Sequence, residues 1–93
     1  MILGVLTVDL VIFGAQSLKD KRRVVLGLKT KLRQRFNVSV AELETADAVK
    51  RCRLGLAMIC GEIRPLHSQF DQMMDLVRSA PGVTLLEYHR EFL

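Results

Sequence analysis

The sequence has little aromatic character, because only 5% of its 93 residues are Phe or Tyr and Trp is absent. Leu, Val, Ile and Met must therefore build the core, and hydrophobic residues make up 49% of the chain, which argues against disorder. No run of about 18 apolar residues exists, so no transmembrane helix is expected. The apolar start contains Asp9 and lacks a basic n-region, so we interpret it as a strand rather than a signal peptide. The protein is expected to be cytoplasmic, with no membrane partner.

The residues of common catalytic and metal sites are also scarce. Cys52 and Cys60 are eight apart in one predicted strand, which separates them by about 26 Å and excludes a disulfide. His67 and His89 are the only histidines, neither has a Cys or Ser nucleophile beside it, and both are interpreted as surface or interface residues. No glycine pattern of a nucleotide-binding loop is present. We therefore expect no enzymatic activity, no metal, no cofactor and no small-molecule substrate.

The length predicts a single domain over residues 1–93. Alternating apolar residues predict strands, and 3.6-residue periodicity predicts helices. Ser17 and Asp20 have the spacing of a helix cap, whereas Pro65 and Pro81 bound a second helix. The predicted elements are strands over 2–13, 37–44, 50–60 and 83–92, a helix over 17–35, and a helix from about 65 that ends before Pro81.

This order of strand, helix, strand, strand, helix, strand is the split βαβ pattern. Right-handed crossovers place both helices on one face of the sheet. The fold is therefore predicted to be α+β, a ferredoxin-like βαββαβ sandwich with a four-stranded antiparallel sheet. The predicted strand order is 4-1-3-2, with the first and third strands in the centre.

The first predicted helix is strongly basic. Eight of the fourteen Lys and Arg residues lie in it against one acid, Asp20, which gives the segment a charge of +7. Five of them fall within a sector of about 120° on a helical wheel. These candidates for nucleic-acid binding are Lys19, Arg22, Arg23, Lys29 and Arg33. Two uses of this surface stay open, an RNA-backbone footprint and an ordinary solvated helix face.

The sheet face away from the helices is expected to be rich in apolar side chains. A small monomer rarely leaves such a face in water, so we expect a homo-oligomer. The candidate interface residues are Val5, Val11, Leu43, Ala57 and Ile59. The middle of this face on the central strands offers no aromatic ring, which disfavours RNA recognition by base stacking; its residues are Thr7, Asp9, Arg53, Gly55 and Ala57.

Three carboxylates, Glu42, Glu44 and Asp47, gather at the predicted end of the second strand. They have the chemistry to bind a cation, but acidic residues also commonly keep an edge strand and its turn soluble. Both interpretations stay open.

Two motifs resemble the YlxP-like family of small bacterial proteins, a domain of unknown function numbered 503. They are the run SLKDKRRV that begins at Ser17 and the run LRQRFNVSVAE that begins at Leu32, and Gly4 adds to the likeness. The resemblance extends through about Gly61 and continues more weakly to the end. Phe13 stands where the family often has Pro, and Val49 stands where it often has Trp.

The resemblance implies a ferredoxin-like fold, and it leaves the molecular function open. Genes of this family often lie beside those of translation initiation factor two and ribosome-binding factor A. That neighbourhood implies a connection with the ribosome, so ribosomal RNA or the small subunit is the expected partner. The hypothesis is thus an RNA- or ribosome-associated accessory protein, and the alternative is a homo-oligomeric protein-interaction module with no nucleic-acid role.

Overall fold

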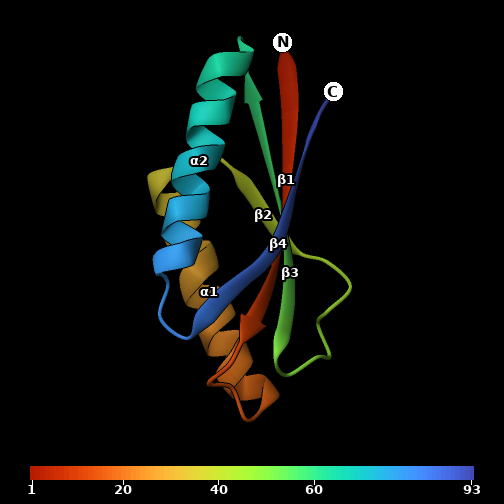
Figure 1. The fold of residues 1–93 in the computed structure, drawn as a ribbon, viewed down its shortest axis with the longest axis vertical. Helices are drawn as coiled ribbons and strands as arrows, with labels where there is room; N and C mark the ends of the chain where they lie inside the picture. The colour runs from red at the N-terminus through yellow and green to blue at the C-terminus, as the bar shows by residue number, and fades with distance from the viewer.

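The computed structural model describes residues 1–93 and has six elements in the predicted order. They are β1 (Ile2–Ile12), α1 (Leu18–Arg35), β2 (Ser39–Glu42), β3 (Arg51–Cys60), α2 (Ile63–Ser79) and β4 (Val83–Phe92) (Figure 1). The predicted ferredoxin-like α+β fold is confirmed. Neither helix combines the length and the apolarity that a membrane crossing requires.

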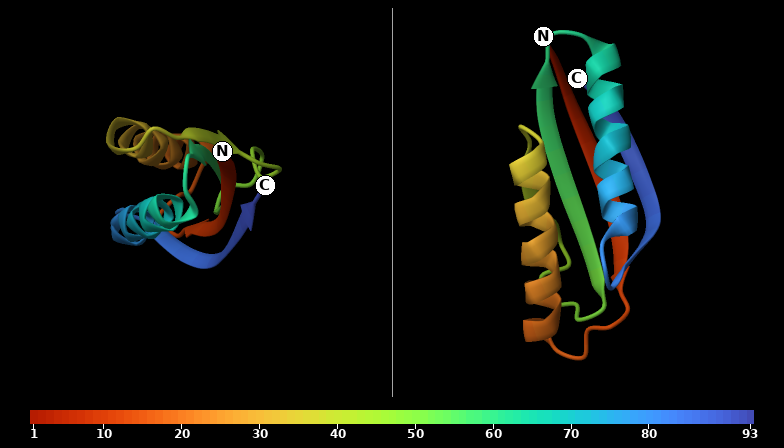
Figure 2. Two further views of the ribbon diagram at one scale, coloured as in Figure 1. Left: turned by 90° about the horizontal axis from the view of Figure 1, so that it is seen from above. Right: turned by 90° about the vertical axis from the view of Figure 1, so that its left-hand side faces the viewer.

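The sheet has the order β2-β3-β1-β4, and every neighbouring pair is antiparallel. The predicted order 4-1-3-2 is therefore confirmed, with β1 and β3 in the centre. Both helices lie on the same side of this sheet (Figure 2). The other side, which we call the open face, carries no covering element.

The core lies between the sheet and the two helices and is built by alternation in β1 and β3. Leu6, Val8 and Leu10 of β1 are fully buried, and so are Leu54 and Leu56 of β3. Because side chains of a strand point to opposite faces in turn, the residues between them point to the open face. The predicted position of Val5, Val11, Ala57 and Ile59 on the face away from the helices is therefore confirmed.

The ends of the helices follow the predicted capping. The hydroxyl of Ser17 accepts a hydrogen bond from the backbone N–H of Asp20 at 3.1 Å, and the Asp20 carboxylate accepts one from the N–H of Gln16 at 3.2 Å. After the C-terminal end of α2, Gly82 turns the chain toward β4 with a φ of 77°, which glycine adopts at little cost. Both helices thus begin and end close to where the sequence predicted.

The second strand is shorter than the predicted 37–44 and covers only Ser39–Glu42. Leu43 still donates its N–H to the carbonyl of Arg53 at 2.8 Å, but Glu44 has a φ of 65° and turns the chain out of the sheet. A left-handed turn at a residue other than glycine is not visible in a pattern of apolar residues.

Candidate nucleic-acid interface

The five predicted nucleic-acid-binding residues, Lys19, Arg22, Arg23, Lys29 and Arg33, all lie on α1, and we call this surface the basic face of α1. Lys29 is half-buried and the other four are exposed. The adjoining side of α1 packs on the sheet through Val25, Leu28 and Leu32, which are buried. The apolar stripe thus holds the helix with its cations turned to solvent.

No residue of the basic face of α1 forms an ion pair within the chain. The structure contains ion pairs at Lys21, Arg53, Arg78 and Arg90, and only the first of these residues lies on α1. Asp20, the one acid of the helix, accepts a backbone hydrogen bond at the helix start. The positive charge of this surface is therefore not neutralised by the protein itself.

Arg33 differs from its neighbours on this face. Its guanidinium donates a hydrogen bond to the carbonyl oxygen of Val40 in β2 at 2.8 Å. Leu43 directs its N–H toward β3, so alternation along the strand turns the backbone of Val40 toward the free edge of the sheet. Arg33 therefore also covers part of that edge, and its side chain is less available to a ligand.

Lys21 is buried, with only 1% of its surface exposed, so it does not contribute to the exposed charge of the helix. Its Nζ lies 2.7 Å from Oε2 of Glu42 and donates to the carbonyl of Thr45 at 2.5 Å. The signal was present in the sequence, because Lys21 stands four residues before Val25 and seven before Leu28, in the middle of the apolar stripe.

A small polar cluster surrounds this lysine at the end of β2. The hydroxyl of Thr45 donates to Oε2 of Glu42 at 2.7 Å and accepts the N–H of Arg53 at 2.9 Å. Partial burial raises the pKa of Glu42, but hydrogen bonds from Lys21 and Thr45 and the charge of Lys21 outweigh this and leave that pKa below its usual value. Burial, together with the charge of Glu42, raises the pKa of the Cys52 thiol to about 12. Cys52 is therefore an unreactive core thiol at neutral pH.

The acidic cluster predicted at Glu42, Glu44 and Asp47 is engaged by basic side chains of the chain. Glu42 pairs with Lys21, and Glu44 lies 3.3 Å from the guanidinium of Arg53. Asp47 is exposed and forms no ion pair. No three side chains of His, Cys, Asp or Glu come together in a way that would hold a metal ion.

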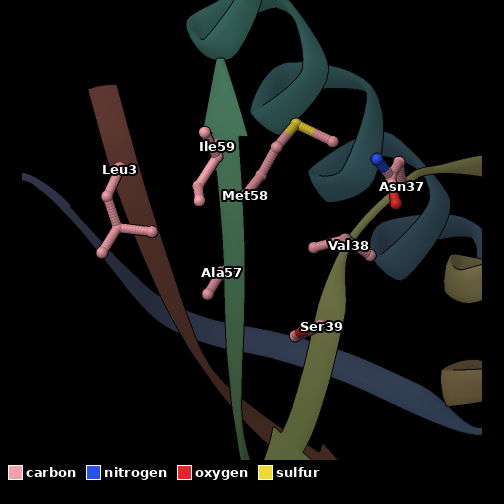
Figure 3. Close-up of a pocket in the computed structure, with 7 residues that line it drawn as sticks. All are labelled: Leu3, Asn37, Val38, Ser39, Ala57, Met58 and Ile59. Atoms are coloured by element: carbon pink, nitrogen blue, oxygen red, sulfur yellow. The ribbon is translucent and has the colours of Figure 1, made fainter. Parts of the chain in front are cut away.

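The predicted interface residues lie on the side of the sheet opposite α1. Val5, Val11 and Ala57 are half-buried in the open face, whereas Leu43 and Ile59 are exposed. Two adjoining hollows of about 310 Å³ and 260 Å³ run along this face and share Ser39 and Ala57. Figure 3 shows the larger hollow, where Ala57 and Ile59 point away from α2 and Met58 points toward it.

The remaining candidate side chains form no catalytic arrangement. His67 and His89 are both exposed, as predicted. Nδ1 of His67 lies 2.9 Å from a guanidinium nitrogen of Arg90, and its ring packs on Phe92 with 4.6 Å between centroids. His67 thus serves the packing of α2 against β4. Cys60 is a half-buried free thiol.

Comparison with known proteins supports the resemblance found in the motifs. The model of the family described as "Protein of unknown function (DUF503)" matches residues 3–90. The chain belongs to this family. The chain is also similar to the "Uncharacterized protein YlxP" of Bacillus subtilis (strain 168), at 26% identity over 81 residues, which is 87% of this chain and 88% of that protein.

In this member of the DUF503 family, the two motifs that carry the resemblance meet in space. The first motif supplies the cap residue Ser17 and the buried Lys21, and the second supplies Glu42. The ion pair between Lys21 and Glu42 therefore fastens α1 to β2, which fixes the position of the basic face relative to the sheet.

Proposed function

We propose that this DUF503 protein binds the phosphate backbone of RNA through the basic face of α1. The observation that carries the proposal is the set of cations on α1 that have no carboxylate partner in the chain. Lys and Arg side chains that neutralise phosphates release condensed counterions, and this release drives backbone binding. The family resemblance favours RNA among the possible polyanions.

The charges on the open face argue against RNA binding there, so the helix side is the expected RNA-binding surface. Glu87 and Glu91 of β4 pair with Asp9 and Val5 of β1, so their side chains lie on the open face. These acidic residues repel phosphate, and the central strands offer no aromatic ring on which a base could stack. Binding is therefore expected to depend on salt far more than on base sequence.

The test is a fluorescence anisotropy titration of a small-subunit ribosomal RNA fragment at several salt concentrations. The variant Arg22→Ala/Arg23→Ala/Lys29→Ala should bind more weakly, and its salt slope should fall by roughly one unit for each replaced residue. These three residues are chosen because none of their side chains forms a hydrogen bond or ion pair in the chain, unlike that of Arg33. Replacement of the exposed Arg22 and Arg23 should change the free energy of unfolding by less than about 0.5 kcal/mol each, and truncation of the half-buried Lys29 leaves the buried stripe of α1 intact, so the fold should persist.

The matched control removes three exposed arginines elsewhere, in the variant Arg51→Ala/Arg64→Ala/Arg78→Ala. It has the same net charge as the α1 variant. If both variants lose affinity equally, the attraction comes from net charge and the assignment to α1 is wrong. If the α1 variant binds as the parent does, the basic face is an ordinary solvated surface.

A further inference from the structure

The open face is built of rows in which β1 and β3 contribute neighbouring side chains. Residues paired in an antiparallel ladder point to the same face, so the register of the two strands defines the rows. The rows are Leu3 with Ile59, Val5 with Ala57, Thr7 with Gly55, Asp9 with Arg53, and Val11 with Arg51.

These rows are graded from apolar to charged. At one end, Leu93 exchanges both backbone hydrogen bonds with Leu3, at 3.1 and 2.8 Å, and so adds a third apolar side chain to the row of Leu3 and Ile59. Ile59 is 63% exposed although it is apolar. In the middle, Leu43 covers Gly55, since a Cβ at Gly55 would lie 2.8 Å from its Cδ1.

Charge within the two central strands of this face is nearly self-neutralised. Nε of Arg53 lies 2.8 Å from Oδ1 of Asp9, and a second guanidinium nitrogen of Arg53 lies 3.3 Å from Glu44. Burial of two charges that already form an ion pair costs less desolvation free energy than burial of an isolated charge. The open face is therefore suited to burial against another apolar surface.

We propose that a second copy of this chain covers the open face, related by a two-fold axis that runs along the strands over the seam between β1 and β3. This rotation lays β1 of one copy over β3 of the other and leaves each row opposite the same row. Leu3 then faces Ile59 of the second copy, and the larger Val5 faces the smaller Ala57. Asp9 faces Arg53 of the second copy, so the charged row is complementary to itself.

The charges of β4 decide between this axis and the other simple two-fold arrangement. An axis across the strands would lay β4 over β4 and bring Glu87 and Glu91 of the two copies together. Like charges in an interface are strongly unfavourable. The axis along the strands instead lays β4 over β2, where Glu91 faces the row of Ser39 and Glu87 faces the row of Leu43, both of which are uncharged.

The size of the face indicates a second copy rather than a peptide or a single helix. Three strands about 33 Å long and the shorter β2 of about 13 Å, spaced about 4.8 Å apart, project an area of about 540 Å², and the corrugated side chains raise its accessible area. A stable interface buries about 800 Å² on each partner. Only a partner that covers the whole face meets this requirement, and a second sheet of the same dimensions does so.

The first test is the mass in solution by sedimentation equilibrium at micromolar concentration. We expect the parent at twice the monomer mass of 10.5 kDa. Ile59→Lys should raise the dissociation constant of the dimer by at least about tenfold, because the lysine would be buried in the apolar row. Leu26→Lys is the matched control, since Leu26 is 61% exposed but lies on α1.

A parent that sediments only as a 10.5 kDa species, or a Leu26→Lys variant that dissociates as readily as Ile59→Lys, would overturn the proposal. Circular dichroism checks that both variants fold. Failure of this proposal is distinguishable from failure of the RNA proposal, because Ile59 lies on the face opposite α1. Ile59→Lys should retain the RNA salt slope of the parent, calculated per chain.

The second test measures the orientation by pulsed electron paramagnetic resonance. A nitroxide is attached at Gly61→Cys in a Cys60→Ser background, because Gly61 is exposed, a Cβ there meets nothing within 4 Å, and Cys52 is buried. With the axis along the strands, the two labels lie at the same end and are separated mainly by the sheet spacing of about 10 Å and the label arms. A separation of a strand length or more, about 33 Å, would exclude this axis.

Discussion

At the scale of single residues, the most consequential feature is the ion pair between the buried Lys21 and the partly buried Glu42. The lysine occupies a core position of α1, yet its ammonium group is satisfied by a carboxylate and a backbone carbonyl. A pair of this kind contributes little net stability over an apolar pair, whereas removal of one partner leaves the other charge uncompensated. Its effect is therefore on where α1 sits rather than on the overall stability of the fold.

Lys21→Met should lower the free energy of unfolding by about 1–3 kcal/mol, because the partly buried Glu42 would lose its charged partner and keep only the hydroxyl of Thr45. The double variant Lys21→Met/Glu42→Leu should recover most of this loss. Urea denaturation measures both, and Lys19→Met is the control, an exposed lysine on the same helix whose loss should cost less than about 0.5 kcal/mol. Equal losses for Lys21→Met and Lys19→Met would contradict the burial of the pair.

The same pair predicts a dependence of stability on pH. The pKa of Glu42 in the folded chain lies below its ordinary value of 4.5, so the unfolded chain binds a proton at this residue more readily than the folded chain does. The contribution of Glu42 is thus fully present above about pH 4.5 and is lost as the pH falls through the lower folded value. In urea denaturation, the difference between the parent and Glu42→Gln should be constant near neutral pH and should shrink in acid. A difference that grows in acid would show that the pKa of Glu42 is raised in the folded chain, not lowered.

At the scale of elements, the packing of α2 on β1 depends on a glycine. A Cβ on Gly4 would lie 2.7 Å from Cδ2 of Leu66 and 2.9 Å from the ring of Phe70, and both of these side chains are fully buried. The absence of a side chain on Gly4 therefore sets how closely α2 approaches the sheet.

Gly4→Ala should lower the free energy of unfolding by about 1–3 kcal/mol, because the core has no room for an added methyl group. Gly27→Ala is the control, and it should change the free energy of unfolding in the opposite direction. Gly27 is exposed within α1 and a Cβ there meets nothing within 4 Å, so the substitution should stabilise the protein by up to about 1 kcal/mol. Thermal or urea denaturation distinguishes the two, and a stabilised Gly4→Ala variant would show that α2 packs less closely than described.

At the scale of the whole molecule, the fold was predictable because the helices and central strands each have a strongly apolar face that packs in the core and a more polar face that does not. The alternation through Leu54, Leu56 and Met58 predicted which face of β3 is buried, and the spacing of Val25, Leu28 and Leu32 did the same for α1. The position of Lys21 in the apolar stripe indicates burial, but lysine is almost never buried without a partner. Its partner Glu42 is 21 residues away in sequence, and no local pattern pairs them.

The sheet order has a consequence for how the protein reaches its fold. The central strand β1 precedes both of its neighbours in the chain, and it pairs with β4 across a separation of about seventy to ninety residues. Until β3 and β4 have been synthesised, eleven largely apolar residues of β1 have no ladder to join. We expect folding in the millisecond to second range typical of such non-local topologies, and a nascent chain whose first segment depends on protection from aggregation.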